Sequence, residues 1–174
     1  MLLTAPGEPY IYYGEEVGLY GTKRSGDEYV RGPMPWGDNT VTAYTDKIDR
    51  GVMTAVKSVT EQQADPHSLL SHYVRFAEVR NTYPALAQGT MSEHPVYNEA
   101  NTDAGKSIAA WYMTKGDEKM LVVHHFGVQP MEIVLTDPIE KAVAVNGDIR
   151  QKDRSEGVSF RMGAYSSVVF KLKR

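Results

Sequence analysis

The 174-residue sequence contains no cysteine, no long run of apolar residues and no excess of basic charge. Without cysteine, the chain forms no disulfide, binds no zinc through thiolates and has no cysteine nucleophile. No segment approaches the ~18 consecutive apolar residues of a membrane-spanning helix. The formal charge of −3 gives no basic field, so neither nucleic acid nor an anionic membrane is an expected partner. With 41% hydrophobic and 24% charged residues, the composition is typical of a globular protein.

Common catalytic and metal-binding motifs are also missing. There is no Gly-x-Ser-x-Gly elbow and no glycine-rich phosphate loop. His67 and His72 are five residues apart, so they do not share a helix face as a metal pair would. His124 and His125 fall in a predicted strand, where neighbouring side chains point to opposite faces. We therefore expect a structural role for this pair, with one histidine half-buried and hydrogen-bonded and the other exposed, and we expect no metal site.

The first sixty residues are rich in Gly, Pro, Tyr and Asp. Tyr10–Tyr13 reads as a buried strand between Pro9 and Gly14. Because the chain enters this segment with no polar leader, either the natural protein begins upstream or a short native terminus begins in a strand. Residues 15–49 are irregular, and a loop of that length is usually functional or disordered. A helix is expected within 49–63.

A second helix has clearer signals. Asp65 suits the N-cap and Pro66 the first helical position. Apolar residues then recur at helical spacing, including Leu69, Tyr73 and Phe76, and Pro84 is expected to end the helix.

From residue 88 onward the sequence is β-like. Short segments rich in Val, Ile, Phe and Tyr occur at 107–114, 118–126, 130–136, 141–145, 157–162 and 166–172. Lys115–Glu118 predicts a hairpin, and Asn146-Gly147 is a strong turn signal because both residues tolerate positive φ. Several short strands without intervening helices indicate an antiparallel sandwich or barrel.

Acidic and aromatic residues of the first part are candidates for a binding site. Glu15 and Glu16 are adjacent, which argues against their acting as a catalytic pair, since glycosidase carboxylates lie roughly 5–9 Å apart across the substrate. One is expected to face solvent and the other to cap or to pair with Arg24 or Arg31. Aromatic residues between 12 and 44 suit a carbohydrate cleft, in which rings stack on sugar faces. They equally suit a loop that packs on its scaffold, and the residues alone favour packing.

Three ordered motifs supply a family resemblance. Pro6-Gly7-Glu8-Pro9-Tyr10-Ile11-Tyr12-Tyr13-Gly14-Glu15-Glu16-Val17-Gly18 resembles the signature of the eighth and last barrel strand of the α-amylase family, glycoside hydrolase family thirteen. Arg31-Gly32-Pro33-Met34-Pro35-Trp36 is similar to the Arg-x-Pro-Met-x-Trp loop of that family. The segment from Asp65 to Leu86 resembles its final barrel helix, and the β-rich remainder resembles its C-terminal sandwich.

The resemblance implies an α+β chain: the remnant of a (β/α)8 barrel end (one strand, a long loop, one or two helices) followed by an antiparallel β-sandwich. Residues 1–86 would belong to the barrel and residues 87–174 to the sandwich. The family's catalytic Asp, Glu and Asp follow earlier strands, so the chain carries no catalytic residue and is expected to be inactive alone. Since barrel active sites lie in the loops after the strands, Arg31, Trp36 and Asp38 are the predicted substrate-binding residues.

The implied function is that of a hydrolase acting on α-glucans such as starch and maltooligosaccharides. The alternative is a carbohydrate-binding or structural sandwich, with Trp111-Tyr112 as sugar platform, although Trp111 in the core and Tyr112 at its border is favoured. No cofactor is expected in this segment, and calcium belongs to the full-length enzyme. Because the barrel remnant would be exposed, we expect the chain to self-associate or its first part, about residues 1–60, to be partly disordered. An export signal would lie upstream, and the resemblance favours an extracytoplasmic bacterial enzyme.

Overall fold

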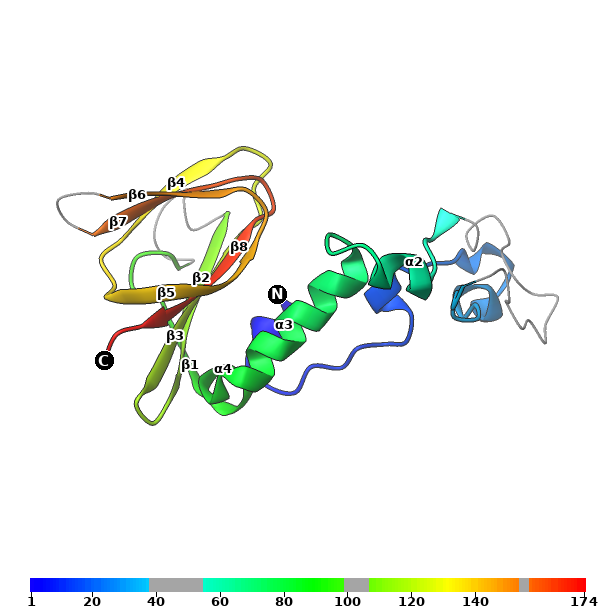
Figure 1. Cartoon of the computed structure of the whole chain (residues 1–174), viewed down its shortest axis with the longest axis horizontal. Helices are drawn as coiled ribbons and strands as arrows, with labels where there is room; N and C mark the ends of the chain where they lie inside the picture. The colour runs from blue at the N-terminus through cyan, green and yellow to red at the C-terminus, as the bar shows by residue number, and fades with distance from the viewer. Residues whose placement is uncertain (38–54, 99–106, 154–156) are drawn as a thin grey trace. The chain divides into compact units, whose positions relative to one another are not determined.

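The computed structural model describes residues 1–37, 55–98, 107–153 and 157–174 (Figure 1). The chain forms two compact units, which we call the sandwich unit (Met1–Pro9 with Phe76–Arg174) and the loop unit (Tyr10–Arg75). Helix α3, Leu69–Thr82, contributes residues to both. Asp38 and residues 49–54 of the helix predicted within 49–63 lie outside the described residues, and the described remainder of that range contains the short helix α2, Val59–Gln63.

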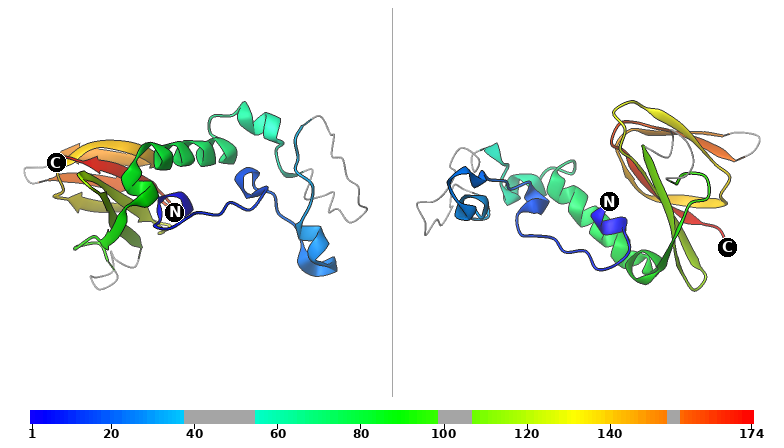
Figure 2. Two further views of the ribbon diagram at one scale, coloured as in Figure 1. Left: turned by 90° about the horizontal axis from the view of Figure 1, so that it is seen from below. Right: turned by 180° about the vertical axis from the view of Figure 1, so that it is seen from behind.

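The sandwich unit contains two antiparallel sheets in the described part of the chain (Figures 1 and 2). The five-stranded sheet has the order β1-β2-β3-β8-β5, and the three-stranded sheet has the order β4-β7-β6. The strands are β1 Thr90–Glu93, β2 Ile108–Lys115, β3 Glu118–His125, β4 Met131–Leu135, β5 Ile139–Asn146, β6 Ile149–Asp153, β7 Val158–Met162 and β8 Ser167–Leu172. The predicted antiparallel sandwich is therefore confirmed.

The turn signals are confirmed with one difference in their role. β2 and β3 form the predicted hairpin across Gly116, whose φ is +55°. Gly147 also turns with positive φ, at +85°, but it joins β5 to β6, which lie in different sheets. The Asn146-Gly147 turn is thus a crossover rather than a hairpin.

The core lies between the two sheets. Alternate residues of β2, β3 and β8, among them Ile108, Leu121 and Phe170, pack against Ile133 and Phe160 of the smaller sheet. Alternation is what an antiparallel sandwich requires, because successive side chains point to opposite faces.

The opposite face of the larger sheet is also buried, by the first residues of the chain and by α4, Pro84–Gln88. Trp111 and His124 lie on this face at ring distance 5.2 Å. Thr4, in the 3-10 helix η1 Leu2–Thr4, accepts from Trp111 Nε1 at 3.3 Å through its carbonyl and contacts His124 Nε2 at 2.9 Å through its hydroxyl. The central strands β2, β3 and β8 are therefore covered on both sides.

Both histidines of the 124–125 pair are buried, so the expectation that one is exposed was wrong. The reason is that β3 is a central strand with both faces covered. His124 contacts Thr4 and Ser167, and His125 Nδ1 lies 2.8 Å from the carbonyl oxygen of Gly163. The expected structural role is consistent with these separate hydrogen bonds on opposite faces.

Arg80 of α3 binds the start of the chain within the sandwich unit. Its guanidinium donates to the carbonyl oxygens of Leu3 (3.2 Å), Ala5 (2.9 Å) and Gly7, and more weakly to that of Ala87 (3.4 Å). Arg80 is only 6% exposed, and burial lowers its pKa. One side chain thus binds the carbonyls of every second residue from Leu3 to Gly7.

A buried polar group holds the segment after β1. His94 Nδ1 accepts from the backbone N–H groups of Val96 and Tyr97, so its Nε2–H donates to Asp137, 3.1 Å away. Tyr112 donates to the other oxygen of Asp137 at 2.7 Å. Burial opposes ionisation of Asp137, but these two hydrogen bonds outweigh it and place its pKa below the ordinary value.

The loop unit departs from the prediction at Tyr10–Tyr13, which form no strand in the described structure and are exposed; Tyr10 is 84% exposed. A strand needs neighbours for its backbone hydrogen bonds, and the described residues supply none here. The described elements of this unit are η2 Glu15–Val17, η3 Lys23–Ser25, η4 Asp27–Val30, α2 Val59–Gln63 and the first half of α3.

The predicted helix begins later than expected. Asp65 accepts from the N–H of His67 in a tight turn, and Ser68 instead caps α3 by accepting from the N–H of Ser71. The predicted end is confirmed, since α3 stops at Thr82 and Pro84 opens α4.

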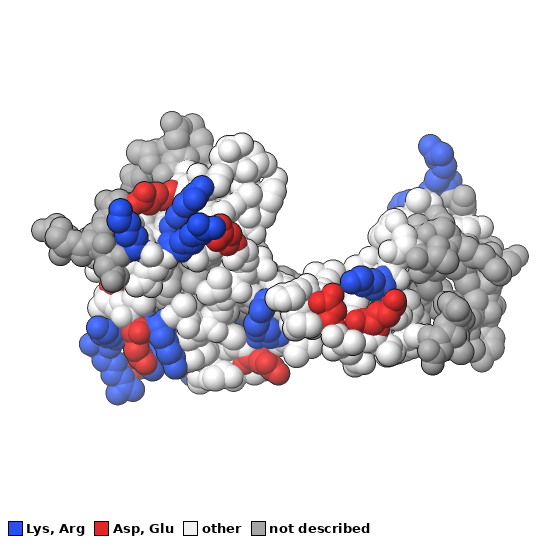
Figure 3. Space-filling model, turned by 45° about the horizontal axis from the view of Figure 1, so that its top comes forward, with Lys and Arg blue, Asp and Glu red and all other residues white. Residues whose placement is uncertain are grey.

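Charged groups of both signs are interspersed on the face shown in Figure 3. Ion pairs of the sandwich unit include Lys171–Glu140 at 2.9 Å and Arg150–Asp148 at 3.1 Å. Among the described helices, none has the length and apolar character needed to cross a bilayer.

Burial makes the stability of the sandwich unit depend on pH through His124. Burial, and secondarily the positive amino terminus, lowers its pKa to about 3. In the unfolded chain the value is ~6.5, so below that pH only the unfolded state binds this proton. The free energy of unfolding therefore has its full value, with respect to His124, above pH ~6.5. It falls by up to ~1.4 kcal/mol per pH unit as the pH drops from about 6 to 4.

Urea unfolding between pH 7.5 and 4.5, followed by Trp111 fluorescence in a Trp36→Phe background, measures this slope. His124→Gln is expected to flatten it, whereas His67→Gln, at an exposed position, should leave it unchanged. Equal slopes for the parent chain and His124→Gln would contradict the assignment.

Candidate functional site

The site is built from a tight turn in the loop unit that directly follows Tyr13. Gly14 (φ +89°) and Gly18 (φ +76°) bracket η2, and Leu19 N–H closes the turn on the Gly14 carbonyl at 2.7 Å. A Cβ at Gly14 would lie 2.7 Å from the Leu19 side chain. The two glycines of the motif are therefore required by left-handed backbone and close approach.

Both glutamates of this turn hold the backbone. Glu15 accepts from Tyr12 N–H at 3.1 Å and from the Tyr73 hydroxyl at 2.8 Å, while Glu16 accepts from Gly14 N–H at 2.8 Å. Burial, and then the bond to Glu15, raises the pKa of Tyr73 to about 12. Of the two expected alternatives, capping or pairing with Arg24 or Arg31, these bonds to backbone N–H groups are consistent with capping, and both glutamates are half-buried, whereas one was expected to face solvent. No sequence signal indicated the Glu15–Tyr73 contact, which spans 58 positions.

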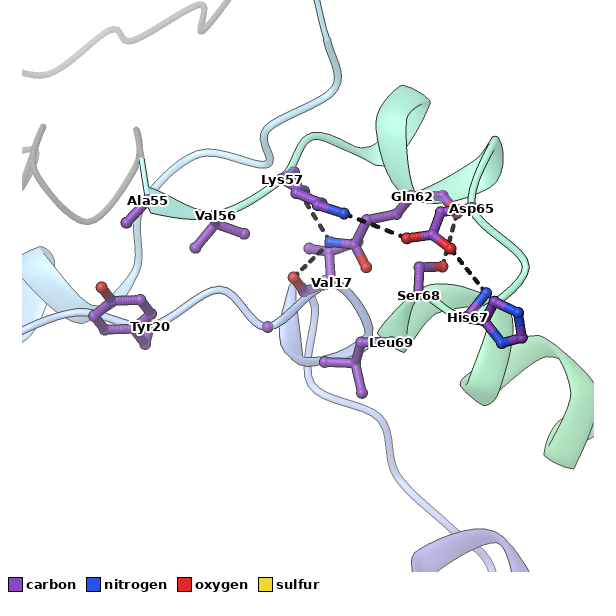
Figure 4. Close-up of a pocket in the computed structure, with 11 residues that line it drawn as sticks. Val17, Tyr20, Ala55, Val56, Lys57, Gln62, Asp65, His67, Ser68 and Leu69 are labelled. Atoms are coloured by element: carbon purple, nitrogen blue, oxygen red, sulfur yellow. Dashed lines mark hydrogen bonds and ion pairs between the residues drawn. The ribbon is translucent and has the colours of Figure 1, made fainter. Parts of the chain in front are cut away.

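Gln62 fixes the adjoining segments (Figure 4). This buried side chain donates to the carbonyls of Val17 (2.8 Å) and Lys57 (2.9 Å) and accepts from Leu70 N–H at 3.2 Å. An open cavity of about 370 Å³ lies here, with the Lys57–Asp65 ion pair at 3.3 Å on its wall. Its buried polar floor, Gln62 and Ser68, is already hydrogen-bonded within the protein.

The predicted substrate segment is held by its backbone. Tyr13 donates to the Gly32 carbonyl at 3.1 Å. The Pro35 carbonyl accepts from Val59 N–H at 2.7 Å, and the Trp36 carbonyl accepts from the hydroxyl of Thr60 at 2.8 Å. The last two bonds attach Pro35 and Trp36 to the start of α2, whose Ser58–Glu61 capping box is complete.

Arg31 and Trp36 are thereby placed with free side-chain surface. Trp36 is 61% exposed and Arg31 is exposed, just after η4. Asp38, the third predicted residue, lies outside the described residues. A guanidinium and an indole on an anchored segment are suited to binding a hydroxylated, partly apolar ligand, by hydrogen bonding and stacking.

The acidic residues of the turn already have partners within the protein. Glu15 and Glu16 are committed to the turn, and within the described residues no group of three His, Asp or Glu is placed to hold a metal ion.

Trp111 and Tyr112 do not form a sugar platform. Trp111 is 7% exposed against Thr4 and His124, and Tyr112 borders the core while donating to Asp137. The interpretation with Trp111 buried and Tyr112 at the core border is confirmed.

Two family models match the chain. "Alpha amylase, catalytic domain" matches residues 1–89, and "Alpha-amylase SusG C-terminal domain" matches residues 108–169. Alpha-amylase SusG of Bacteroides thetaiotaomicron is 58% identical over 172 residues, covering 99% of this chain and 25% of the relative. Alpha-amylase 3 of Dictyoglomus thermophilum is 32% identical over 181 residues, covering 98% of this chain and 32% of the relative.

Solved structures show the same fold. The alpha-amylase from H. orenii superposes with a TM-score of 0.78 at 22% identity, over 98% of this chain and 33% of that one. The arrangement is therefore that of a barrel remnant followed by a β-sandwich. The chain belongs to the α-amylase family of glycoside hydrolases. It spans about a quarter to a third of the length of these curated relatives.

We expect the Glu15–Tyr73 hydrogen bond to stabilise the turn at Gly14–Gly18. Tyr73→Phe removes the hydroxyl donor and leaves one oxygen of a carboxylate without its protein partner, which costs about 1–2 kcal/mol locally. Faster amide exchange at Tyr12 and faster chymotrypsin cleavage at Tyr10–Tyr13 are the expected results. Tyr83→Phe, outside this unit, is the matched control. Unchanged exchange at Tyr12 would show that the bond does not hold the turn.

Proposed function

We propose that these residues act as the C-terminal portion of an α-amylase-type hydrolase of α-glucans such as starch and maltooligosaccharides, and that alone they do not cleave. The supporting observation is the 58% identity to an α-amylase over 172 residues, which includes both units. The loop unit contributes one wall of the glucan site, and the sandwich unit supports the end of the barrel.

The proposed substrate contacts are Arg31, Trp36 and Asp38. Exposure of the first two on a segment fixed at Gly32, Pro35 and Trp36 supports this role, because pre-ordered groups bind with less loss of conformational entropy. Asp38 is proposed from the sequence alone.

We also propose a family boundary at residues 86 and 87. The catalytic-domain match reaches residue 89, and the C-terminal match begins at residue 108. The compact units divide differently, since Phe76–Leu86 fold with the sandwich. A barrel-derived helix end is thus part of the packing of the second domain.

Two measurements test the function. The purified 174-residue chain should release no reducing sugar from starch, and turnover by it would overturn the proposed absence of catalytic groups. In a longer protein that joins this chain to an α-amylase barrel, Trp36→Ala and Arg31→Ala should each raise KM for maltooligosaccharides by about tenfold. Trp36→Phe, which keeps a ring, should recover most of the loss, and an unchanged KM in both alanine variants would contradict their placement.

The chain alone is proposed to self-associate through Tyr10–Tyr13. Tyr10 and Tyr12 are 84% and 58% exposed, and a cluster of exposed apolar side chains promotes association between chains. Light scattering should give a mass above one chain that increases with concentration. Tyr12→Lys should return the monomer, while Tyr165→Lys, in the other unit, should not. A monomer at all concentrations would contradict the proposal.

A further inference from the structure

The crossover from β5 to β6 contains a chemically reactive dipeptide, Asn146-Gly147. Of the five asparagines in the sequence, three precede Thr, one precedes Glu and only Asn146 precedes Gly. The backbone nitrogen that follows an asparagine can attack the side-chain amide carbon and close a five-membered ring, and the side chain of the following residue hinders that approach. Because glycine has no Cβ, Asn146-Gly147 is the least hindered of these pairs.

The fold itself requires glycine at position 147. Gly147 has a φ of +85°, and a Cβ built on it would lie 2.9 Å from the Cβ of Ser166. Any larger residue would therefore adopt a strained backbone and displace Ser166. The unhindered neighbour of Asn146 is thus imposed by the turn.

Both reacting groups are free of hydrogen bonds. Within the part of the chain that the structure describes, no hydrogen bond engages the Asn146 carboxamide or the Gly147 N–H. Asn146 is also the last residue of β5, an edge strand of the larger sheet, and strand ends open more readily than strand centres. The two groups can therefore approach each other without breaking a hydrogen bond that either of them makes.

Two other described asparagines are held in place. The Asn98 side-chain amide donates to the carbonyl oxygens of His94 at 3.2 Å and Pro95 at 3.4 Å. Asn81 lies inside α3, where helical hydrogen bonds fix the backbone on both sides of it. Each of them also precedes a residue with a side chain, so neither combines the features of Asn146.

We propose that Asn146 is a site of spontaneous modification in the folded chain, where the asparagine converts through a cyclic imide to aspartate and isoaspartate. The Gly147 nitrogen loses its proton to base and attacks Cγ of Asn146. The new N–Cγ bond forms, the Cγ–Nδ2 bond breaks, and Nδ2 takes up a proton and leaves as ammonia. Water then opens the ring. Opening at the new bond gives aspartate, and opening at the original peptide bond gives isoaspartate.

The two products should differ in their effect on the sandwich unit. Isoaspartate adds one methylene to the backbone at the point where the chain crosses between the sheets. Asn146 lies opposite Ser167 in the β5–β8 ladder, and Ser167 Oγ lies 2.6 Å from Nδ1 of His124. A longer backbone shifts this pairing, whereas aspartate keeps the normal backbone and adds only a negative charge. Isoaspartate is therefore the destabilising product.

Peptide mapping of the full 174-residue chain, kept folded in mildly alkaline buffer, tests the site. Trypsin releases residues 142–150, in which Asn146 is the one asparagine, and residues 81–106, which carry the asparagines at 81, 98 and 101. The amide in 142–150 should convert at least about tenfold faster than those in 81–106, a barrier difference of about 1.4 kcal/mol. A protein isoaspartyl methyltransferase should label the converted peptide, because it methylates isoaspartate and not ordinary aspartate.

Two results would overturn the site. One is equal conversion in the two peptides. The other is conversion of 142–150 in urea but not in the folded chain, because the folded turn would then be protecting the amide.

Two variants separate the chemistry from the fold. Asn146→Gln keeps an amide but would need a six-membered ring, so conversion should be lost, and conversion that persists would contradict the mechanism. Asn146→Asp adds the charge on a normal backbone, so its urea midpoint should match that of the parent chain. The isoaspartyl chain, separated by ion-exchange chromatography, should unfold at lower urea, and a midpoint equal to the parent's would overturn the predicted effect on the β5–β8 pairing. Asn81→Gln is the matched control and should leave conversion at Asn146 unchanged.

Discussion

The sandwich unit depends on one buried cation, the guanidinium of Arg80. It binds the carbonyls of Leu3, Ala5 and Gly7, which lie 73 to 77 positions away, and thereby fixes the first residues of the chain. The structure describes no carboxylate partner for it, so several carbonyl dipoles share the charge. A buried cation left without such partners would cost several kcal/mol, so Arg80 is buried only where the carbonyls of the chain start accept from it.

Fixing the chain start determines what the larger sheet can present to solvent. Thr4 contacts Trp111 and His124, and α4 packs against β2 and β3, so the outer face of these central strands is shielded from water. This explains why β3 is buried continuously from Met120 to His125 instead of alternating. It also explains why the aromatic pair in β2 serves packing.

The sequence predicted what local chemistry determines. The β2–β3 hairpin, the six apolar strands and the helix stop at Pro84 follow from turn residues, β-branched runs and proline. It did not predict β1 or β6, because Thr90–Glu93 is exposed throughout and Ile149–Asp153 is mostly polar, so neither shows alternation. At the site, the exposure of Trp36 was consistent with its predicted role, whereas the bonds of Glu15 and Gln62 join distant segments and left no local pattern.

The eighth-strand motif shows why a correct family resemblance gave a wrong local structure. At its start, Arg80 binds the carbonyl of Gly7, while Tyr10–Tyr13 are exposed. Ordering four residues costs about 4–8 kcal/mol of backbone entropy. Burying their side chains would return roughly 1.5–3 kcal/mol each, but only where neighbouring strands cover them. The motif therefore specifies a strand conditionally: its apolar residues become a strand in the presence of a barrel, and the residues described here do not provide one.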